Sequence, residues 1–185
     1  MSAIYLIRHG KSKRNWSVDP DSPLGKLGRQ QSLVWANKMA SIMDPIPIYS
    51  SPKLRTMQTA GFLAKIWGIN VEMHQSLEEI PIPTEISMAQ RSSWLEAFTR
   101  KSWSMQSDIH LNWEKHFLSF LRTFESDVVI VSHYLNINRA IAVSKNSLNT
   151  ICMELDHCSA TVMTLYGNKL SFLEYWSNIG PNEFP

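Results

Sequence analysis

A short apolar run that stops on charged residues is the feature that most constrains this chain. Residues 4–7 read Ile-Tyr-Leu-Ile, and the sequence continues Arg8-His9-Gly10. Such a run is typical of a buried strand. A buried strand seldom ends on a cation beside an imidazole unless an anion lies there. The run therefore predicts a strand that leads into an anion site; the alternative is a strand end followed by a solvated basic loop.

A second apolar run, Val-Val-Ile-Val at residues 128–131, ends in the same way, on Ser132-His133. Between the two runs, candidate strands alternate with candidate helices, a pattern typical of βαβ units and a largely parallel sheet. The carboxyl ends of parallel strands lie at one edge of a sheet, where ligands bind in open α/β folds. We therefore expect His9 and His133 to meet in one pocket.

The remaining elements follow from periodicity and from turn residues. A loop at 16–25 precedes a helix whose apolar spacing includes Leu27, Val34 and Met39, and Ser51-Pro52 is read as a helix cap and first helical position. The other expected strands are 46–49 and 69–73, the other helices are 87–100, 108–124 and 136–143, and a hairpin joins 161–166 to 169–175.

The helix that follows Ser51-Pro52 contributes a further candidate, Arg55, in its first turn. Free backbone N–H groups at a helix N-terminus favour an anion, and a guanidinium can bind phosphate oxygens with two hydrogen bonds. Taken alone, Arg55 would be read as a solvated surface residue. Because Arg8 is expected at the same sheet edge, we place Arg55 in the pocket.

Composition limits the class of protein. The 185 residues suit one domain, 1–185, and 44% apolar with 18% charged residues indicates an ordinary globule. A net charge of +2 does not indicate nucleic-acid binding. No apolar run reaches membrane length, and Cys152 and Cys158 fit reduced thiols, so we expect a cytoplasmic protein without a membrane partner.

Four motifs in this order resemble the histidine phosphatase superfamily, which includes the phosphoglycerate mutases and many small phosphatases. The resemblance covers residues 4 to about 175. The motifs are Arg8-His9-Gly10, Ser51-Pro52-x-x-Arg55-x-x-Gln58-Thr59-Ala60, Leu77-Glu78-Glu79 and Ser132-His133. It implies an α/β fold, a three-layer α/β/α sandwich with a mostly parallel central sheet.

The resemblance also implies roles for individual residues. His9 is expected to be the nucleophile that forms a phosphohistidine, with Arg8, Arg55 and His133 around the phosphate and Asn15 at its rim. Glu79 is the expected proton donor because the family pattern is leucine, any residue, then glutamate. Glu78 remains the rival, since the acid could be displaced by one position.

The chain also departs from the family pattern. Lys11 follows Gly10, where relatives usually have an acidic residue or glutamine, and the segment 80–83, Ile-Pro-Ile-Pro, replaces a glycine-rich one. These departures affect the substrate rather than the core chemistry. Residues 80–106 are read as a cap insertion that selects the substrate, with Arg91, Trp94 and Trp103 as lining candidates; plain helix packing is the alternative.

These observations favour a phosphomonoesterase of the histidine acid phosphatase type, acting on a small phosphorylated metabolite. Neither a cofactor nor a metal is expected, because side chains supply the cations, and the other histidines, His74, His110, His116 and His157, are expected to be solvated or in the core. A phosphoglycerate mutase and a phosphate-binding protein with weak or no turnover are the alternatives. Mutases shield the phosphoryl group with long loops or tails, and this chain ends soon after its last strand. Whether the chain forms a homodimer stays open.

Overall fold

Six strands form the central sheet in a computed structural model that describes residues 1–16 and 18–177. Their order is β3-β2-β4-β1-β5-β6. Strands β1 to β4 run parallel to one another, and β5 lies antiparallel to both of its neighbours. The strands are β1 (Ser2–Arg8), β2 (Ile48–Ser50), β3 (Val71–Met73), β4 (Val128–Ser132), β5 (Ala160–Tyr166) and β6 (Lys169–Trp176). The mostly parallel sheet confirms the expected fold class.

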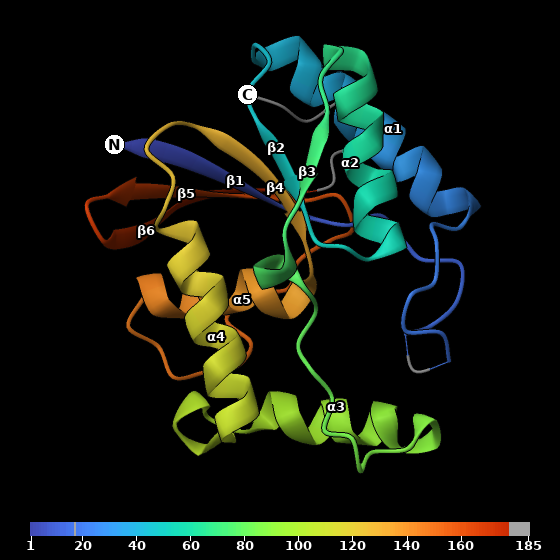
Figure 1. Ribbon diagram of the computed structural model, residues 1–185, viewed down its shortest axis with the longest axis vertical. Coiled ribbons are helices and arrows are strands. Elements are labelled where there is room, and N and C mark those ends of the chain that lie inside the picture. The colour runs from blue at the N-terminus through green and yellow to red at the C-terminus, as the bar shows by residue number, and fades with distance from the viewer. Residues whose placement is uncertain (17, 178–185) are drawn as a thin grey trace.

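Helices cover both faces of this sheet and give it three layers (Figure 1). Helices α1 and α2 lie against one face and α4 and α5 against the other, while α3 lies beyond the α4 and α5 layer, away from the strands (Figure 1). The helices are α1 (Lys26–Ile42), α2 (Leu54–Trp67), α3 (Arg91–Arg100), α4 (Asp108–Leu121) and α5 (Tyr134–Ser144). Short 3₁₀ turns are η1 (Gln75–Leu77), η2 (Met88–Gln90) and η3 (Trp103–Met105). In the described part of the chain, no helix combines the length and the apolar character that crossing a bilayer requires.

The two-residue period of a strand divides the core between the two faces. In β4, Val128 and Ile130 pack with α4 and α5, whereas Val129 and Val131 pack with α1 and α2. A strand buried on both faces needs apolar residues at every position, which explains the unbroken run at 128–131. A smaller cluster, Ile80, Phe98, Trp103 and Leu135, forms beneath α3.

Two local predictions were wrong. Helix α1 buries Trp35, Ala36 and Met39, whereas Leu27 and Val34 are about half exposed, because the helix presents a different face to the sheet. Ser51 does not cap α2, which begins at Leu54 with Lys53 at its N-cap. The hydroxyl of Ser51 contacts His133 instead.

Candidate active site

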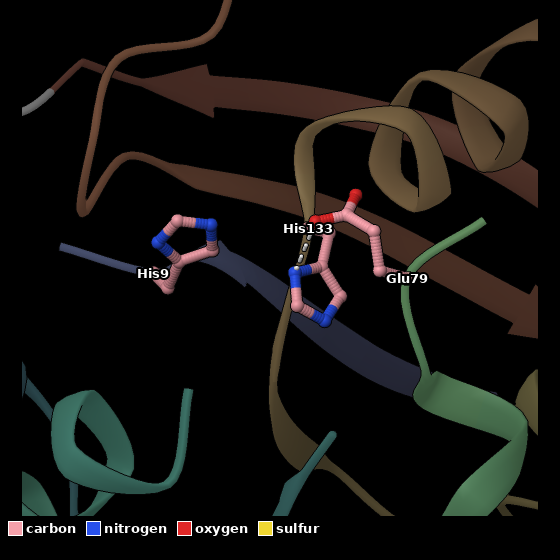
Figure 2. A group of neighbouring side chains, drawn as sticks. All are labelled: His9, Glu79 and His133. Carbon is pink, nitrogen blue, oxygen red and sulfur yellow. Dashed lines mark ion pairs between the residues drawn. The ribbon is translucent and has the colours of Figure 1, made fainter. Parts of the chain in front are cut away.

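The two strand-end histidines meet, as the parallel sheet requires. Arg8 is the partner of Ser132 in the register between β1 and β4, so His9 and His133 leave the same edge side by side. Their ring centroids lie 5.4 Å apart with the rings edge to face. Figure 2 shows Glu79 reaching this pair from the segment that follows η1. Residues from three distant parts of the sequence therefore form one cluster.

Hydrogen bonds determine the tautomer of His9. Its Nδ1 lies 2.8 Å from the carbonyl oxygen of Gly10, which can only accept, so Nδ1 carries the proton. Its Nε2 lies 3.2 Å from Nε of Arg55, which can only donate, so Nε2 presents a lone pair. Burial lowers the pKa of His9 well below its usual value, and the neighbouring His133 and Arg55 lower it further. The imidazole is therefore neutral, with its nucleophilic nitrogen directed towards Arg55.

Arg55 is the cation at the centre of the cluster. It is the second residue of α2 and only 2% exposed. Its Nη2 donates to Oε2 of Glu79 at 2.8 Å, and its Nη1 donates to the carbonyl of Pro20 at 2.9 Å. A guanidinium offers several donors in one plane, so this one side chain holds both the histidine and the carboxylate. The pocket position expected for Arg55 is therefore the one observed.

Glu79 forms a pair with the buried His133. Nδ1 of His133 lies 3.0 Å from Oε2 of Glu79 (Figure 2), and its Nε2 lies 2.8 Å from Oγ of Ser51. Burial alone would raise the pKa of Glu79, but His133 and Arg55 outweigh it and hold the pKa below its usual value. The ionised carboxylate then accepts the Nδ1 proton of His133. His133 itself is fully buried, and burial lowers its pKa.

Glu78 points the other way. Its side chain is 41% exposed and its carboxylate pairs with Nζ of Lys53 at 2.6 Å, whereas the side chain of Glu79 is 15% exposed. The backbone of this segment is fixed because Trp113 and Asn136 both donate to the carbonyl oxygen of Glu78. The register that was left open between the two acids is thus resolved in geometry: Glu79 is the acid beside His9.

A cavity of about 470 Å³, called here the His9 pocket, opens in front of this cluster. Its lining includes the expected residues Arg8, His9, Asn15, Arg55 and Glu79. Arg8 donates from Nη1 to the carbonyl of Leu155, and its guanidinium lies over the Tyr134 ring, 4.9 Å from the centroid. His133 does not line the pocket: it is fully buried, and its Nδ1 lies beside Glu79 and Arg55, which do line it.

Helix α3 covers one side of the His9 pocket with Leu95 and Thr99. A second cleft of about 590 Å³ adjoins the pocket and shares Trp16, Glu79 and Ile80 with it. Arg91 lines this second cleft and lies over the Trp16 ring. For Trp103 the alternative of plain helix packing holds. It is 2% exposed and packs between Phe98 and Trp113, because it belongs to the small core beneath α3.

The structure brings together three side chains that have metal-ligating atoms, which the sequence spacing did not suggest. The donor atoms of His9, Glu79 and His133 all lie within 4.8 Å of one another. The guanidinium of Arg55 already hydrogen-bonds to the first two. A fixed cation at this position repels a metal ion, and it supplies the positive charge that a phosphate needs.

Close backbone packing positions His9, and only part of this packing was expected. A Cβ on Gly10 would lie 2.5 Å from the carbonyl oxygen of Gly28, so both glycines are needed where β1 meets α1. The N–H of Gly10 donates to Oγ1 of Thr59, whose hydroxyl donates to the carbonyl of Arg55. These contacts join the end of β1 to the first turns of α2.

His157 is the site residue that sequence reasoning missed. It was expected to be solvated or in the core, yet it lines the His9 pocket, and its Nδ1 donates to the carbonyl of His9 at 2.9 Å. Burial, with Arg8 nearby, lowers the pKa of His157 to about 4. No motif surrounds His157 in the sequence, and it lies beside His9 only because of the path of the segment between α5 and β5. His74, His110 and His116 do not line the pocket, as expected.

Several solved structures share this fold, two of them structures of phosphatases. The mycobacterial glucosyl-3-phosphoglycerate phosphatase is 18% identical with a TM-score of 0.76, over 97% of this chain and 100% of that one. The phosphoserine phosphatase of Entamoeba histolytica is 22% identical with a TM-score of 0.69, over 96% and 98%. YhfR of Bacillus stearothermophilus is 19% identical with a TM-score of 0.76, over 93% and 95%.

No curated protein sequence matches the chain. The sequence model of the histidine phosphatase superfamily, branch 1, matches residues 4–178, which is nearly the whole chain. The match includes both strand-end histidines, the arginine that joins them and the acid beside them. The chain therefore belongs to branch 1 of the histidine phosphatase superfamily.

Proposed function

We propose that the chain is a metal-independent phosphatase that hydrolyses a small phosphate monoester through a phosphohistidine on His9. One observation carries the proposal: His9 is neutral, and its Nε2 lone pair is directed at the guanidinium of Arg55. A nucleophile that faces a buried cation is arranged to attack an anionic electrophile. A phosphate that enters the pocket would take the place of His9 as the partner of Arg55.

In the first step, Nε2 of His9 attacks phosphorus, and the bond from phosphorus to the ester oxygen breaks. Arg8 and Arg55 neutralise the phosphoryl oxygens as charge moves onto them. The departing oxygen takes a proton from the carboxyl of Glu79. The phosphate draws Arg55 away from Glu79 and adds negative charge beside it, so the pKa of Glu79 rises and its carboxylate takes up a proton from solvent when substrate binds. The first step yields a phosphohistidine and a free alcohol.

In the second step, water attacks the phosphorus of the phosphohistidine. The carboxylate of Glu79 accepts a proton from this water, and the bond from phosphorus to Nε2 breaks. Phosphate leaves, His9 is neutral again, and Glu79 releases the proton that it took from water when Arg55 pairs with it once more. His133 acts as a positioning residue, since its Nδ1 holds the Glu79 carboxylate and Ser51 holds its other nitrogen.

Turnover of p-nitrophenyl phosphate tests the proposal, together with acid and alkaline quenching of the enzyme during turnover. We expect release of nitrophenol and phosphate, and a phosphoenzyme that survives alkali and hydrolyses in acid, as a phosphoramidate does. His9→Ala should abolish both. His74→Gln is the matched control, because His74 stacks on Phe120 outside both cavities. An acid-stable phosphoenzyme would contradict attack by histidine, since it indicates a serine or threonine ester.

The two alternatives give different results in the same assay. A phosphoglycerate mutase converts 3-phosphoglycerate into its isomer and releases little phosphate. A phosphate-binding protein without turnover releases no nitrophenol, although phosphate protects it against thermal unfolding.

A further inference from the structure

The His9 pocket holds more positive charge than one phosphate needs. Five of the residues that line it have cationic side chains, namely Arg8, Lys11, Lys13, Arg14 and Arg55, and only one, Glu79, has a carboxylate. That carboxylate is already engaged by Arg55 and His133. The two histidines of the lining add no charge near neutrality, because burial lowers the pKa of both. The net charge of the residues that line the pocket is therefore positive near neutral pH.

Three of these cations have no place in the proposed reaction. Arg8 and Arg55 serve the reacting phosphate, which leaves Lys11, Lys13 and Arg14 at the mouth of the pocket. All three are exposed, and none forms an ion pair with an acid in the part of the chain that the structure describes. Like charges that line one cavity repel each other and create a positive potential that draws in anions.

The backbone that carries these cations is held in place. The N–H of Lys13 donates to the carbonyl of Pro23, and the N–H of Arg14 donates to Oγ of Ser22. Lys11 lies against Gly28, where an added Cβ would lie 2.0 Å from the Lys11 carbonyl oxygen. The three side chains are therefore presented from a fixed strip of chain beside His9.

We propose that the substrate carries a second anionic group, a phosphate or a carboxylate, and that Lys11, Lys13 and Arg14 bind it. The proposal rests on the proposed function, because it concerns the part of the same substrate that lies away from the reacting phosphate. The three residues determine specificity and take no part in bond breaking. They increase the affinity for the substrate and the rate at which it encounters the pocket. Added salt weakens both effects because it screens the charges.

The test compares three substrates: p-nitrophenyl phosphate with no second anion, 3-phosphoglycerate with a carboxylate, and fructose 1,6-bisphosphate with a second phosphate. The test variant replaces Lys11, Lys13 and Arg14 by Gln together. The control replaces Lys26, Lys115 and Arg29 by Gln, which removes the same charge from exposed sites outside both cavities.

We expect the test variant to lose about 10- to 100-fold in kcat/KM on at least one doubly anionic substrate, mainly through KM, the size of two or three lost charge contacts. Its change on p-nitrophenyl phosphate should stay within about threefold, and the control should change little on any substrate. The substrate with the larger loss identifies the second group as phosphate or carboxylate. Equal losses on all three substrates would overturn the proposal.

Two further measurements separate this proposal from the proposed function. Calorimetry can measure the binding of fructose 1,6-bisphosphate and 3-phosphoglycerate to His9→Ala without turnover. When the triple substitution is added to His9→Ala, the affinity for the more tightly bound of these two ligands should fall at least tenfold. Unchanged affinity would refute the cation site even if p-nitrophenyl phosphate is hydrolysed. Arg91→Gln tests the second cleft. If Arg91→Gln lowers kcat/KM on doubly anionic substrates and the triple variant does not, the second anionic group binds in the second cleft and the proposal fails.

Discussion

Nε of Arg55 donates a hydrogen bond to Nε2 of His9 across 3.2 Å, and the same guanidinium holds Glu79 through Nη2. One side chain on α2 therefore sets both the protonation of the candidate nucleophile and that of the candidate acid. In the proposed reaction, a phosphate that binds to Arg55 would release both of them at once. The charged groups that the proposed reaction uses are thus paired with one another in this structure.

Replacing Arg55 with Lys removes the guanidinium plane and keeps the charge. We expect a loss of about 2–4 kcal/mol of transition-state stabilisation, the size of one lost oxyanion donor, which corresponds to roughly 30- to 1,000-fold in kcat/KM. Steady-state hydrolysis of p-nitrophenyl phosphate measures it. Arg29→Lys, at an exposed site on α1, is the control. A near-neutral Arg55→Lys would remove Arg55 from phosphate binding.

Glu79→Gln and Glu78→Gln test the proton donor. We expect Glu79→Gln to lose about 10²- to 10⁴-fold in kcat on an alkyl phosphate, the range of general acid catalysis. The loss should shrink on p-nitrophenyl phosphate, whose leaving group departs without a proton. Glu78→Gln removes only a partly exposed pair with Lys53 and should change kcat less than about threefold. The reverse order would show that Glu78 turns inward during turnover.

Chelation tests the group formed by His9, Glu79 and His133, whose ligating atoms lie within 4.8 Å of one another. Because Arg55 supplies the cation there, we expect EDTA to leave turnover unchanged and vanadate to inhibit it as a phosphoryl mimic. A loss in EDTA that a divalent ion restores would make the cluster a metal site.

Gly28→Ala tests the contact between α1 and the strip after His9. The added Cβ would meet the backbone of Lys11, so we expect a loss of about 1–3 kcal/mol in the free energy of unfolding, the cost of overpacking. Gly61→Ala is the matched control. Gly61 also lies in a helix, but nothing lies within 4 Å of its added Cβ. It should stabilise the protein by about 0.5–1 kcal/mol. Urea denaturation measures both, and equal effects would contradict the close approach.

Stability should fall as the pH decreases from 7 to 5. Burial lowers the pKa of His9, His133 and His157 in the folded protein, His157 to about 4, while each titrates near 6.5 in an unfolded chain. Below about pH 6.5 the unfolded state binds more protons, so the free energy of unfolding decreases. Glu79 adds its own loss only below about pH 4.3, where the unfolded carboxyl takes up a proton.

Thermal unfolding at the two pH values measures the effect. His157→Gln cannot be protonated, so it should narrow the difference in Tm between pH 7 and pH 5. An unchanged difference would show that His157 is not held neutral in the folded protein.

Much of the site could be predicted from the sequence because topology determines it. The runs at 4–7 and 128–131 are apolar at every position, as only strands covered on both faces are, and parallel strands end at one edge. His9 and His133 follow those runs directly, and Arg55 lies in the first turn of the helix after β2, the strand next to β4 in the sheet. Periodicity and strand order were enough to bring these residues together.

Side-chain direction was decided only by the tertiary structure. The side chains of Glu78 and Glu79 point in opposite directions along an extended segment. The hydrogen bonds that Trp113 and Asn136 donate to the Glu78 carbonyl determine which of the two faces His9. The sequence around Ser51 is typical of a helix cap. Because β4 pairs with β2, however, the hydroxyl of Ser51 contacts His133 instead. His157 has no motif and reaches the pocket through a distant connection. A sequence pattern reflects only residues that are neighbours along the chain. These contacts depend on how separate helices and strands pack, which brings together residues whose separation in the sequence follows no pattern.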